Sequence, residues 1–169
     1  MDAGGFADWI LAMQRGMRTG EGSDVPCGGC VACCTSGQLV PVDEDERAAL
    51  PAHAVVETAA GTVLARTEDG ACLSLVQNRC TVYESRPSAC RIYDCRIFPA
   101  TGLEPEDDKP AIREQAGRWR FRIETDDDRR RHVATRSAVQ MIVMQQVGGR
   151  PTSTTQLAAQ AVLHHDELL

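Results

Sequence analysis

The length, composition and charge of this chain exclude several classes of protein. It has 169 residues, the size of one domain, and a net charge of −6. Residues 1–100 carry 8 arginines against 13 acidic residues, and residues 101–169 carry 10 basic against 11 acidic residues, so neither part is basic. Because phosphate neutralisation supplies most non-specific binding to nucleic acids, this balance argues against nucleic acid as the main partner.

The apolar content predicts that burial alone barely suffices for folding. Val, Leu, Ile and Phe together make up 34 residues, about 20% of the chain, which is the lower edge for a well-packed globular core. Eight cysteines are the obvious additional source of cohesion. We therefore expect a core that is stabilised by cross-links through cysteine.

The cellular compartment decides whether those cysteines stay reduced or form disulfides. The first twenty residues lack a positive n-region, and Asp8 interrupts their apolar stretch, so they do not resemble a secretory signal. No stretch approaches the apolar length of a membrane span. We expect a cytoplasmic protein with no membrane partner, in which clustered cysteines hold metal or do redox chemistry more often than they form disulfides.

The first third of the chain predicts a helix, a loop and a mixed segment. A helix is indicated by apolar residues at helical spacing: Phe6, Trp9, Ile10, Met13 and Met17. Residues 19–37 form a Gly-rich loop with the first four cysteines, and residues 38–42 form an edge strand that contains Pro41. Asp43 and Glu46 form a capping box for a helix that Pro51 breaks or restarts before Gly61.

The middle of the chain changes to the period of strands. Residues 62–66 and 71–76 flank Glu68-Asp69-Gly70, which predicts a hairpin, and residues 80–83 form another short strand. Ser85 and Pro87 begin a short helix. Residues 101–110 form a polar connector that leads to an alternating strand around Trp119, Phe121 and Ile123.

Two helices complete the chain. The first runs from about 128 to 147 and ends before Gly148-Gly149 and Pro151, and the second is capped by Ser153 with Gln156. The basic run 129–131 follows the acidic run 126–128 and indicates a solvated helix start. The predicted fold is a single α+β domain over 1–169. It has a small, irregular, metal-stabilised cysteine core at 27–98 with short strands, and 111–169 pack on this core.

The cysteine spacing is C-x2-C-x2-C-C-x37-C-x7-C-x9-C-x4-C. A C-x2-C loop directs two thiolates to one ion, as in zinc ribbons and iron–sulfur loops, and the first three cysteines match the opening of a bacterial ferredoxin motif. Bound metal is therefore the expected cofactor, either iron (mononuclear, polynuclear or iron–sulfur) or zinc. The candidate metal ligands are Cys27, Cys30, Cys33, Cys34, Cys72, Cys80, Cys90 and Cys95.

Two pairs of these cysteines are expected to diverge. Cys33 and Cys34 are adjacent, and Cys90 and Cys95 would lie about 140° apart on a helix. Two four-ligand sites, or one site with spare thiols, both suit this pattern. Because the first four cysteines cannot close a site alone, we expect Cys72, Cys80 and Cys90 to meet them. Nearby arginines either offset thiolate charge or pair with Glu84 and Asp94: Arg79, Arg86, Arg91 and Arg96.

These motifs resemble a known family. The segments are CGGCVACC at 27–34, GACL at 70–73, CTVY at 80–83 and RPSACR at 86–91. Together they are similar to the zinc- or iron-chelating CxxCxxCC domains, the YkgJ-type cysteine-cluster proteins, over about 27–98. The resemblance implies chelation of zinc or iron by the cysteines. Family members often continue C-R-x-[FY]-P, whereas here Cys95 intervenes before Phe98-Pro99.

Three functions remain open. The first is a metal-binding protein, with iron favoured by the ferredoxin-like opening, and the second is an iron-dependent redox enzyme or electron-transfer protein. The third, a thiol oxidoreductase that uses Cys27 and Cys30, is disfavoured because that motif lies in a loop. No catalytic residue, substrate or protein partner is identified. Tyr83, Tyr93 and Asp94 are expected to pack near ligands, and four histidines without ligand spacing are expected at the surface: His53, His132, His164 and His165.

Overall fold

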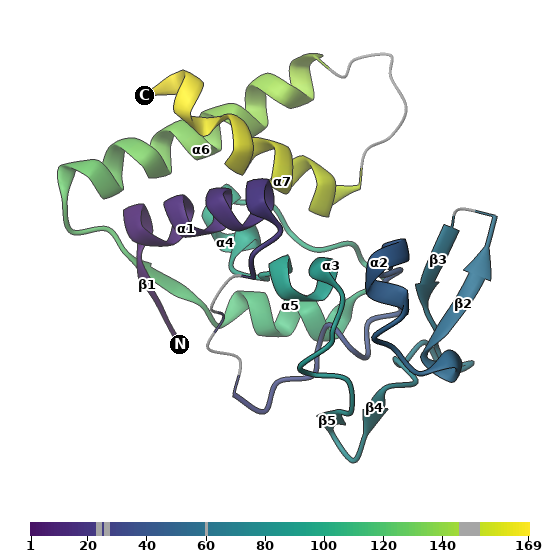
Figure 1. Ribbon diagram of the computed structural model, residues 1–169. Helices are drawn as coiled ribbons and strands as arrows, with labels where there is room; N and C mark the ends of the chain where they lie inside the picture. The colour runs from purple at the N-terminus through teal and green to yellow at the C-terminus, as the bar shows by residue number, and fades with distance from the viewer. Residues whose placement is uncertain (23–24, 26–27, 60, 146–152) are drawn as a thin grey trace. The chain divides into compact units, whose positions relative to one another are not determined.

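The computed structural model describes residues 1–22, 25, 28–59, 61–145 and 153–169, and it is mixed α+β as predicted (Figure 1). The chain divides into two compact units. Residues Gly20–Tyr93 form one, called the cysteine unit here, and Met1–Thr19 with Asp94–Leu169 form the other, called the helical unit. In the described ranges, no helix combines the length and the apolar composition needed to cross a bilayer. The division into one domain with a core at 27–98 stays a prediction.

In the first part of the cysteine unit, the predicted helix is confirmed and the strand predicted at 38–42 is wrong. Helix α2 (Glu44–Arg47) begins at the predicted cap, where the Glu46 carboxylate accepts a hydrogen bond from the Asp43 N–H at 3.3 Å. Residues 38–42 make only a single bridge, between Pro41 and Val63. Because proline lacks an N–H, it cannot donate to a regular ladder at this position.

After Pro51 the chain is helical for only one short turn and then extended, so the helix does not restart as far as Gly61. A short 3₁₀ helix η1 (Ala52–Ala54) leads into strand β2 (Val55–Thr58). This strand pairs antiparallel with β3 (Gly61–Leu64), from Val55 opposite Leu64 to Thr58 opposite Gly61. Two β-branched valines in succession favour a strand, and the partner strand satisfies their backbone groups.

The predicted hairpin has its turn, and its first strand is present as β3, but β3 pairs with β2 rather than with residues 71–76. The Gly70 N–H donates to the Thr67 carbonyl at 3.0 Å, and Gly70 has a φ of 85°, which a glycine adopts without strain. Across the turn only Arg66 and Cys72 form a bridge. The strands that follow are β4 (Leu75–Val76) and β5 (Arg79–Cys80), which pair with each other. Both are shorter than the strands predicted at 71–76 and 80–83.

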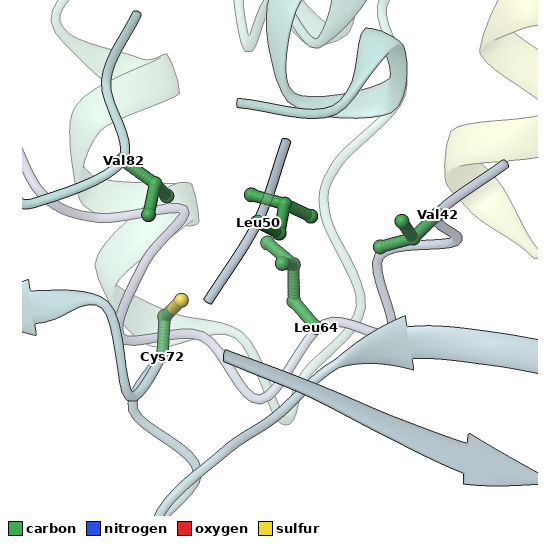
Figure 2. Packing of buried hydrophobic residues seen from close by; sticks show 5 residues of the cluster. All are labelled: Val42, Leu50, Leu64, Cys72 and Val82. Atoms are coloured by element: carbon green, nitrogen blue, oxygen red, sulfur yellow. The ribbon is translucent and has the colours of Figure 1, made fainter. Parts of the chain in front are cut away.

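Helix α3 (Ser88–Ile92) follows Pro87 as predicted and completes the cysteine unit. It ends at Ile92, so Cys90 and Cys95 do not share a helix and the 140° argument does not apply. The core of the unit is a cluster of five buried side chains (Figure 2): Val42, Leu50, Leu64, Cys72 and Val82.

The helical unit begins with a strand that the sequence pattern did not predict. Strand β1 (Asp2–Gly5) pairs in parallel with β6 (Arg120–Arg122), the short version of the predicted strand around Trp119. Its sequence, DAGG, carries no strand periodicity that could have predicted it. The strand forms through main-chain pairing with β6, which leaves no pattern in the side chains. Helix α1 (Phe6–Thr19) then follows as predicted, and it buries Phe6 and Trp9 among others.

The two long helices of this unit are confirmed. Helix α6 (Asp126–Gln145) begins two residues earlier than predicted, and its predicted end at Val147 with Gly148-Gly149 and Pro151 lies outside the described residues. Helix α7 (Thr154–His164) packs along α6 and is followed by the 3₁₀ helix η2 (His165–Leu168) (Figure 1). Their contact is built on small and branched residues: Ala138, Val139, Ile142 and Ala161.

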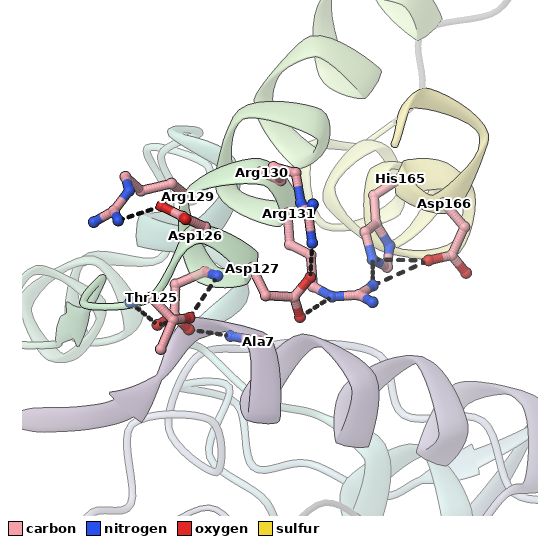
Figure 3. Close-up of polar contacts among 10 residues, drawn as sticks. Ala7, Thr125, Asp126, Asp127, Arg129, Arg130, Arg131, His165 and Asp166 are labelled. Atoms are coloured by element: carbon pink, nitrogen blue, oxygen red, sulfur yellow. Dashed lines mark hydrogen bonds and ion pairs between the residues drawn. The ribbon is translucent and has the colours of Figure 1, made fainter.

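The basic run at the start of α6 is solvated at Arg129 and Arg130, as expected, whereas Arg131 is largely buried and also pairs with Asp166 at 3.4 Å (Figure 3). Arg129 pairs with Asp126 at 2.5 Å, and Arg130 and Arg131 pair with Asp127 at 3.1 and 2.9 Å. Because these ion pairs lie within the first turns of the same helix, the run stabilises α6 locally.

Two further helices were missed by the sequence pattern. Helix α4 (Ile97–Thr101) is short and contains Pro99, and helix α5 (Pro110–Gly117) begins with proline at its first position. Both bury apolar side chains, with Phe98 and Ile112 1% exposed. Their lengths of 5 and 8 residues are too short for helical periodicity to stand out, so tertiary burial decides them.

Candidate metal centre

Four of the eight predicted ligands gather in the core of the cysteine unit. Cys72 is buried, with 7% of its surface exposed, and it lies beside Leu50, Leu64 and Val82 (Figure 2). Three half-buried cysteines pack against the same cluster: Cys34, Cys80 and Cys90. Cys34 of the first motif therefore meets Cys72, Cys80 and Cys90, the three later cysteines that the sequence predicted to join it.

Main-chain hydrogen bonds hold three of these cysteines in register. The Cys72 N–H donates to the Cys34 carbonyl at 2.8 Å, which joins two segments separated by 37 residues. The Leu75 N–H donates to the Cys72 carbonyl at 2.9 Å, and Leu75 is in turn paired with Cys80 across β4 and β5. This network fixes the backbone from which the sulfur atoms project.

Glu46 positions the fourth cysteine. Its carboxylate accepts a hydrogen bond from the Ser88 N–H at 2.6 Å, at the first turn of α3, and pairs with Arg91 at 3.3 Å. Helix α3 carries Cys90, so Glu46 links the helix that it caps, α2, to the helix that presents a thiol. The sequence identified Glu46 only as part of a capping box, because Ser88, the residue that it contacts, lies 42 positions further along the chain.

The adjacent cysteines differ in their surroundings. Residues 31–35 form a tight turn in which the Cys34 N–H donates to the Val31 carbonyl at 2.9 Å. Cys34 is half-buried at the cluster, whereas Cys33 is exposed. These two neighbours in the chain therefore differ in their access to solvent.

The thiols influence one another's ionisation. A hydrogen bond from the Cys34 thiol lowers the pKa of Cys33 to about 7, with a further contribution from the Arg66 guanidinium. The same hydrogen bond raises the pKa of Cys34 well above its ordinary value, and burial adds to the rise. Burial, and then the negative charge of Cys33, Cys72 and Cys80, raises the pKa of Cys90 to about 12. These thiolates would repel one another without a cation.

Arg66 was missed by the sequence analysis. Its NH1 group donates to the Cys34 carbonyl at 3.2 Å and to the Gly70 carbonyl at 3.0 Å. No local signal marks it, since it lies 32 residues from Cys34. Of the arginines that were considered, Arg96 pairs with Asp94 at 2.8 Å, and Arg86 lies over the Tyr83 ring at 3.9 Å.

The chemistry of the donor set fits zinc or iron. The clustered donors are sulfur atoms, which zinc and iron accept as thiolates and which calcium or magnesium do not favour. Within the described residues, no three His, Cys, Asp or Glu side chains are arranged as a group that could hold a metal ion. The described sulfur atoms thus form a cluster of suitable type, but they do not make a closed coordination shell.

The other predicted ligands lie elsewhere. Cys27 is outside the described residues, and Cys30 is half-buried after the turn at Gly28-Gly29. Cys95 belongs to the helical unit, where it is buried and its Sγ accepts a hydrogen bond from Trp119 Nε1 at 3.3 Å. Metal binding by these three cysteines stays a prediction.

One histidine does not lie at the surface, contrary to the prediction. His165 is fully buried, with Nδ1 2.7 Å from the Val162 carbonyl and Nε2 3.2 Å from Arg131 NH1. Asp94 is also buried, and it accepts a hydrogen bond from Trp9 Nε1 at 2.9 Å. Both serve the packing of the helical unit, because each has its polar atoms satisfied there.

Comparison with known proteins agrees with the site. The model of the CxxCxxCC family, described as a putative zinc- or iron-chelating domain, matches residues 26–117. This is more than half of the chain, and it extends beyond the 27–98 of the resemblance to include α4 and α5. No curated protein and no solved structure matches. The chain belongs to the CxxCxxCC family of zinc- or iron-chelating domains.

Proposed function

We propose that the protein binds iron as its native metal through the clustered cysteines, and that zinc can occupy the same thiolates. The observation that carries this proposal is the gathering of Cys34, Cys72, Cys80 and Cys90 in one core. The four residues lie in four different local structures, so local structure alone does not bring them together. In chain order these are the turn at 31–35, an isolated β-bridge with Arg66, strand β5 and helix α3.

Each part of the chain has a role in this proposal. Cys34, Cys72, Cys80 and Cys90 supply the innermost sulfur donors, and Cys27, Cys30, Cys33 and Cys95 complete the proposed set of metal-associated cysteines. Arg66 places a positive charge beside Cys33 and Cys34, which offsets part of the thiolate charge. Leu50, Leu64 and Val82 exclude water from one side of the cluster. Bound iron would supply one-electron redox chemistry.

An iron–sulfur centre in an electron-transfer protein or redox enzyme is the second candidate. It is favoured by the first three cysteines, whose C-x2-C-x2-C spacing matches the opening of a ferredoxin motif. Both candidates need reduced thiols, so we infer a cytoplasmic location, where thiols stay reduced.

Anaerobic purification from iron-replete cells tests the proposal. We expect a coloured protein with stoichiometric iron, because iron thiolates absorb strongly in the visible range, and acid-labile sulfide if the centre is an iron–sulfur cluster. A colourless protein with stoichiometric zinc and neither iron nor sulfide would contradict iron as the native metal. A protein without any bound metal would contradict the proposed function.

Serine variants identify the ligands in the same experiment. Cys34→Ser, Cys72→Ser, Cys80→Ser and Cys90→Ser should each lower the metal content, whereas Ser36→Ala in the neighbouring turn is the matched control. Unchanged metal content in all four serine variants would exclude the cluster as the site. Cys95→Ser is measured alongside, and a loss of metal there would extend the centre to the helical unit.

A further inference from the structure

The helical unit holds a cavity that the metal-binding proposal does not use. Its volume is about 380 Å³, which is in the range of small-molecule sites, and every residue that lines it belongs to this unit. Buried Phe98 and Trp119 line it together with half-buried Phe121 and Ile123. The cavity therefore offers a ligand an apolar, mostly aromatic wall.

Helix α6 adds a positive charge to this apolar wall, because Arg136 lines the same cavity. Arg136 Nε donates to His132 Nε2 at 3.1 Å, one turn earlier on the helix, and Arg136 Nη2 donates to the Pro99 carbonyl at 3.5 Å. Gly102 leaves space for the guanidinium, since a Cβ at this position would lie only 3.2 Å from Arg136 Cζ. Contacts from two segments of the chain thus hold the guanidinium at the cavity.

The guanidinium of Arg136 keeps donors available for a ligand. It has five N–H donors, and the bonds to His132 and Pro99 use two of them. The arginines at the start of the same helix differ, since Arg129 and Arg130 pair with aspartates of α6. Across the described ranges, Arg136 has no such carboxylate partner. Its remaining N–H groups can therefore bind an anion from solution.

The charge at the cavity matches one negative charge on a ligand. The charged residues that line it are Arg120, Arg136 and Glu104, which together carry one positive charge. Arg120 Nη1 is already bound to two main-chain carbonyls, so Arg136 is the better donor. Burial, and then the charge of Arg136, lowers the pKa of His132, so its ring is neutral at pH 7. A monocarboxylate balances this charge, whereas a phosphate monoester carries nearly two negative charges.

We propose that this cavity binds a small aromatic monocarboxylate. Its carboxylate lies on the Arg136 guanidinium, whose parallel N–H groups match two carboxylate oxygens, and its ring lies against Phe121 and Ile123. Phe121 and His132 each pack edge-on against Phe6, with ring centroids 5.1 and 4.9 Å away, and a ligand ring extends this cluster. The described residues that line the cavity include no cysteine, so the proposed site does not depend on the metal centre.

Solution NMR of the full chain tests the proposal, with 3-phenylpropionate as the probe. We expect saturable shifts of the Ile123 methyl and His132 ring signals, because both residues line the cavity. The Ile142 methyl signals, from the contact between α6 and α7, are the reference and should stay unchanged. 3-Phenylpropanamide, which lacks the charge, and propionate, which lacks the ring, should each bind at least about tenfold more weakly.

Substitutions at Arg136 assign the carboxylate to its partner. Arg136→Gln should raise the dissociation constant of 3-phenylpropionate by at least about tenfold, since charge-assisted hydrogen bonds are lost. Arg136→Lys keeps the charge but not the planar pair of donors, so a smaller increase is expected. Arg130→Gln, at an exposed arginine of the same helix outside the cavity, is the matched control and should keep the wild-type value. Circular dichroism verifies that each variant folds.

Several results would overturn the proposed site. A wild-type protein without a saturable shift at Ile123 in millimolar 3-phenylpropionate would exclude binding in the cavity. Equal affinity for the amide or for propionate would contradict the ligand class, and tighter binding of phenyl phosphate would assign the cavity to a phosphate ligand instead. An unchanged dissociation constant in both Arg136 variants would show that the carboxylate is not held there. If Arg136→Gln does not fold, Arg136→Lys decides alone, because an unchanged dissociation constant there excludes the bidentate contact.

Discussion

Asp128 joins the first turn of α1 to the corner that precedes α6. Its carboxylate accepts hydrogen bonds from the Ala7 N–H at 2.8 Å, the Glu124 N–H at 3.2 Å and the Thr125 N–H and hydroxyl at 2.9 and 2.7 Å. The bond from Ala7 is the largest of the effects that hold the pKa of Asp128 well below its usual range. One side chain thus satisfies the backbone of two helix starts that lie 121 residues apart.

We expect Asp128→Asn to lower the free energy of unfolding at pH 7 by about 1–3 kcal/mol, since an amide replaces two acceptor oxygens with one. The difference should persist above the pKa of an unfolded aspartate, about 3.9, and shrink as the pH falls below it. In that range the unfolded state binds a proton that the folded carboxylate refuses, so wild-type stability rises with pH. Urea titrations between pH 2.5 and pH 7 measure it, with exposed Asp108→Asn as the control. Parallel pH profiles for Asp128→Asn and the wild type would contradict the assignment.

Helix α7 shows how much one capping residue contributes at the scale of an element. The Gln156 N–H donates to the Ser153 hydroxyl at 3.1 Å, and the Gln156 side chain accepts a bond from the Ser153 N–H at 3.2 Å. The helix then buries Ala158, Ala161 and Val162, which are fully inaccessible to solvent. The cap fixes where the helix begins, and the small buried residues allow close packing of α7.

Removal of this cap should destabilise the helical unit. We expect Ser153→Ala to lower the free energy of unfolding by about 1 kcal/mol, because the Gln156 N–H at the start of α7 loses the hydroxyl that accepts its hydrogen bond. Urea unfolding followed by tryptophan fluorescence measures it, since Trp9 and Trp119 both belong to this unit. Ser137→Ala, at an exposed serine of α6, is the control. Equal effects of the two substitutions would show that the cap does not support the fold.

At the scale of the whole molecule, the two units depend on different kinds of cohesion. The helical unit buries large apolar side chains, among them Phe6, Phe98 and Trp119, each with at most 1% of its surface exposed. The described core of the cysteine unit has five buried members, and one of these is Cys72. Metal binding is therefore expected to supply much of the stability of the cysteine unit.

Chelation of the metal under reducing conditions should unfold the cysteine unit. Structural zinc sites contribute about 10–16 kcal/mol of apparent binding free energy, which is as large as the stability of a typical domain. Hydrogen exchange measures this at the Leu64, Cys72 and Leu75 amides, each of which has a hydrogen-bonded backbone partner in the folded unit. Amides within α6 provide the reference signal. Protection that survives in metal-free, reduced protein would contradict a role of metal in folding.

The sequence by itself determined the features that depend on short-range order. The spacing of the cysteines identified the donor type and the family, and helical periodicity with caps identified α1, α6 and α7. The turn at Gly70 was also predictable, because Asp-Gly favours a tight turn wherever it stands.

Only the tertiary structure decided which distant segments meet. The pairings of β1 with β6 and of β2 with β3, the burial of His165 and the short helices α4 and α5 carry no strong local signal. Cys34 shares a core with Cys72, Cys80 and Cys90, while Cys33 beside it is exposed; the sequence indicated that these two neighbours diverge but not which of them is buried. The physical reason is that propensities and caps act within a few residues, whereas burial selects among side chains that the whole chain brings together.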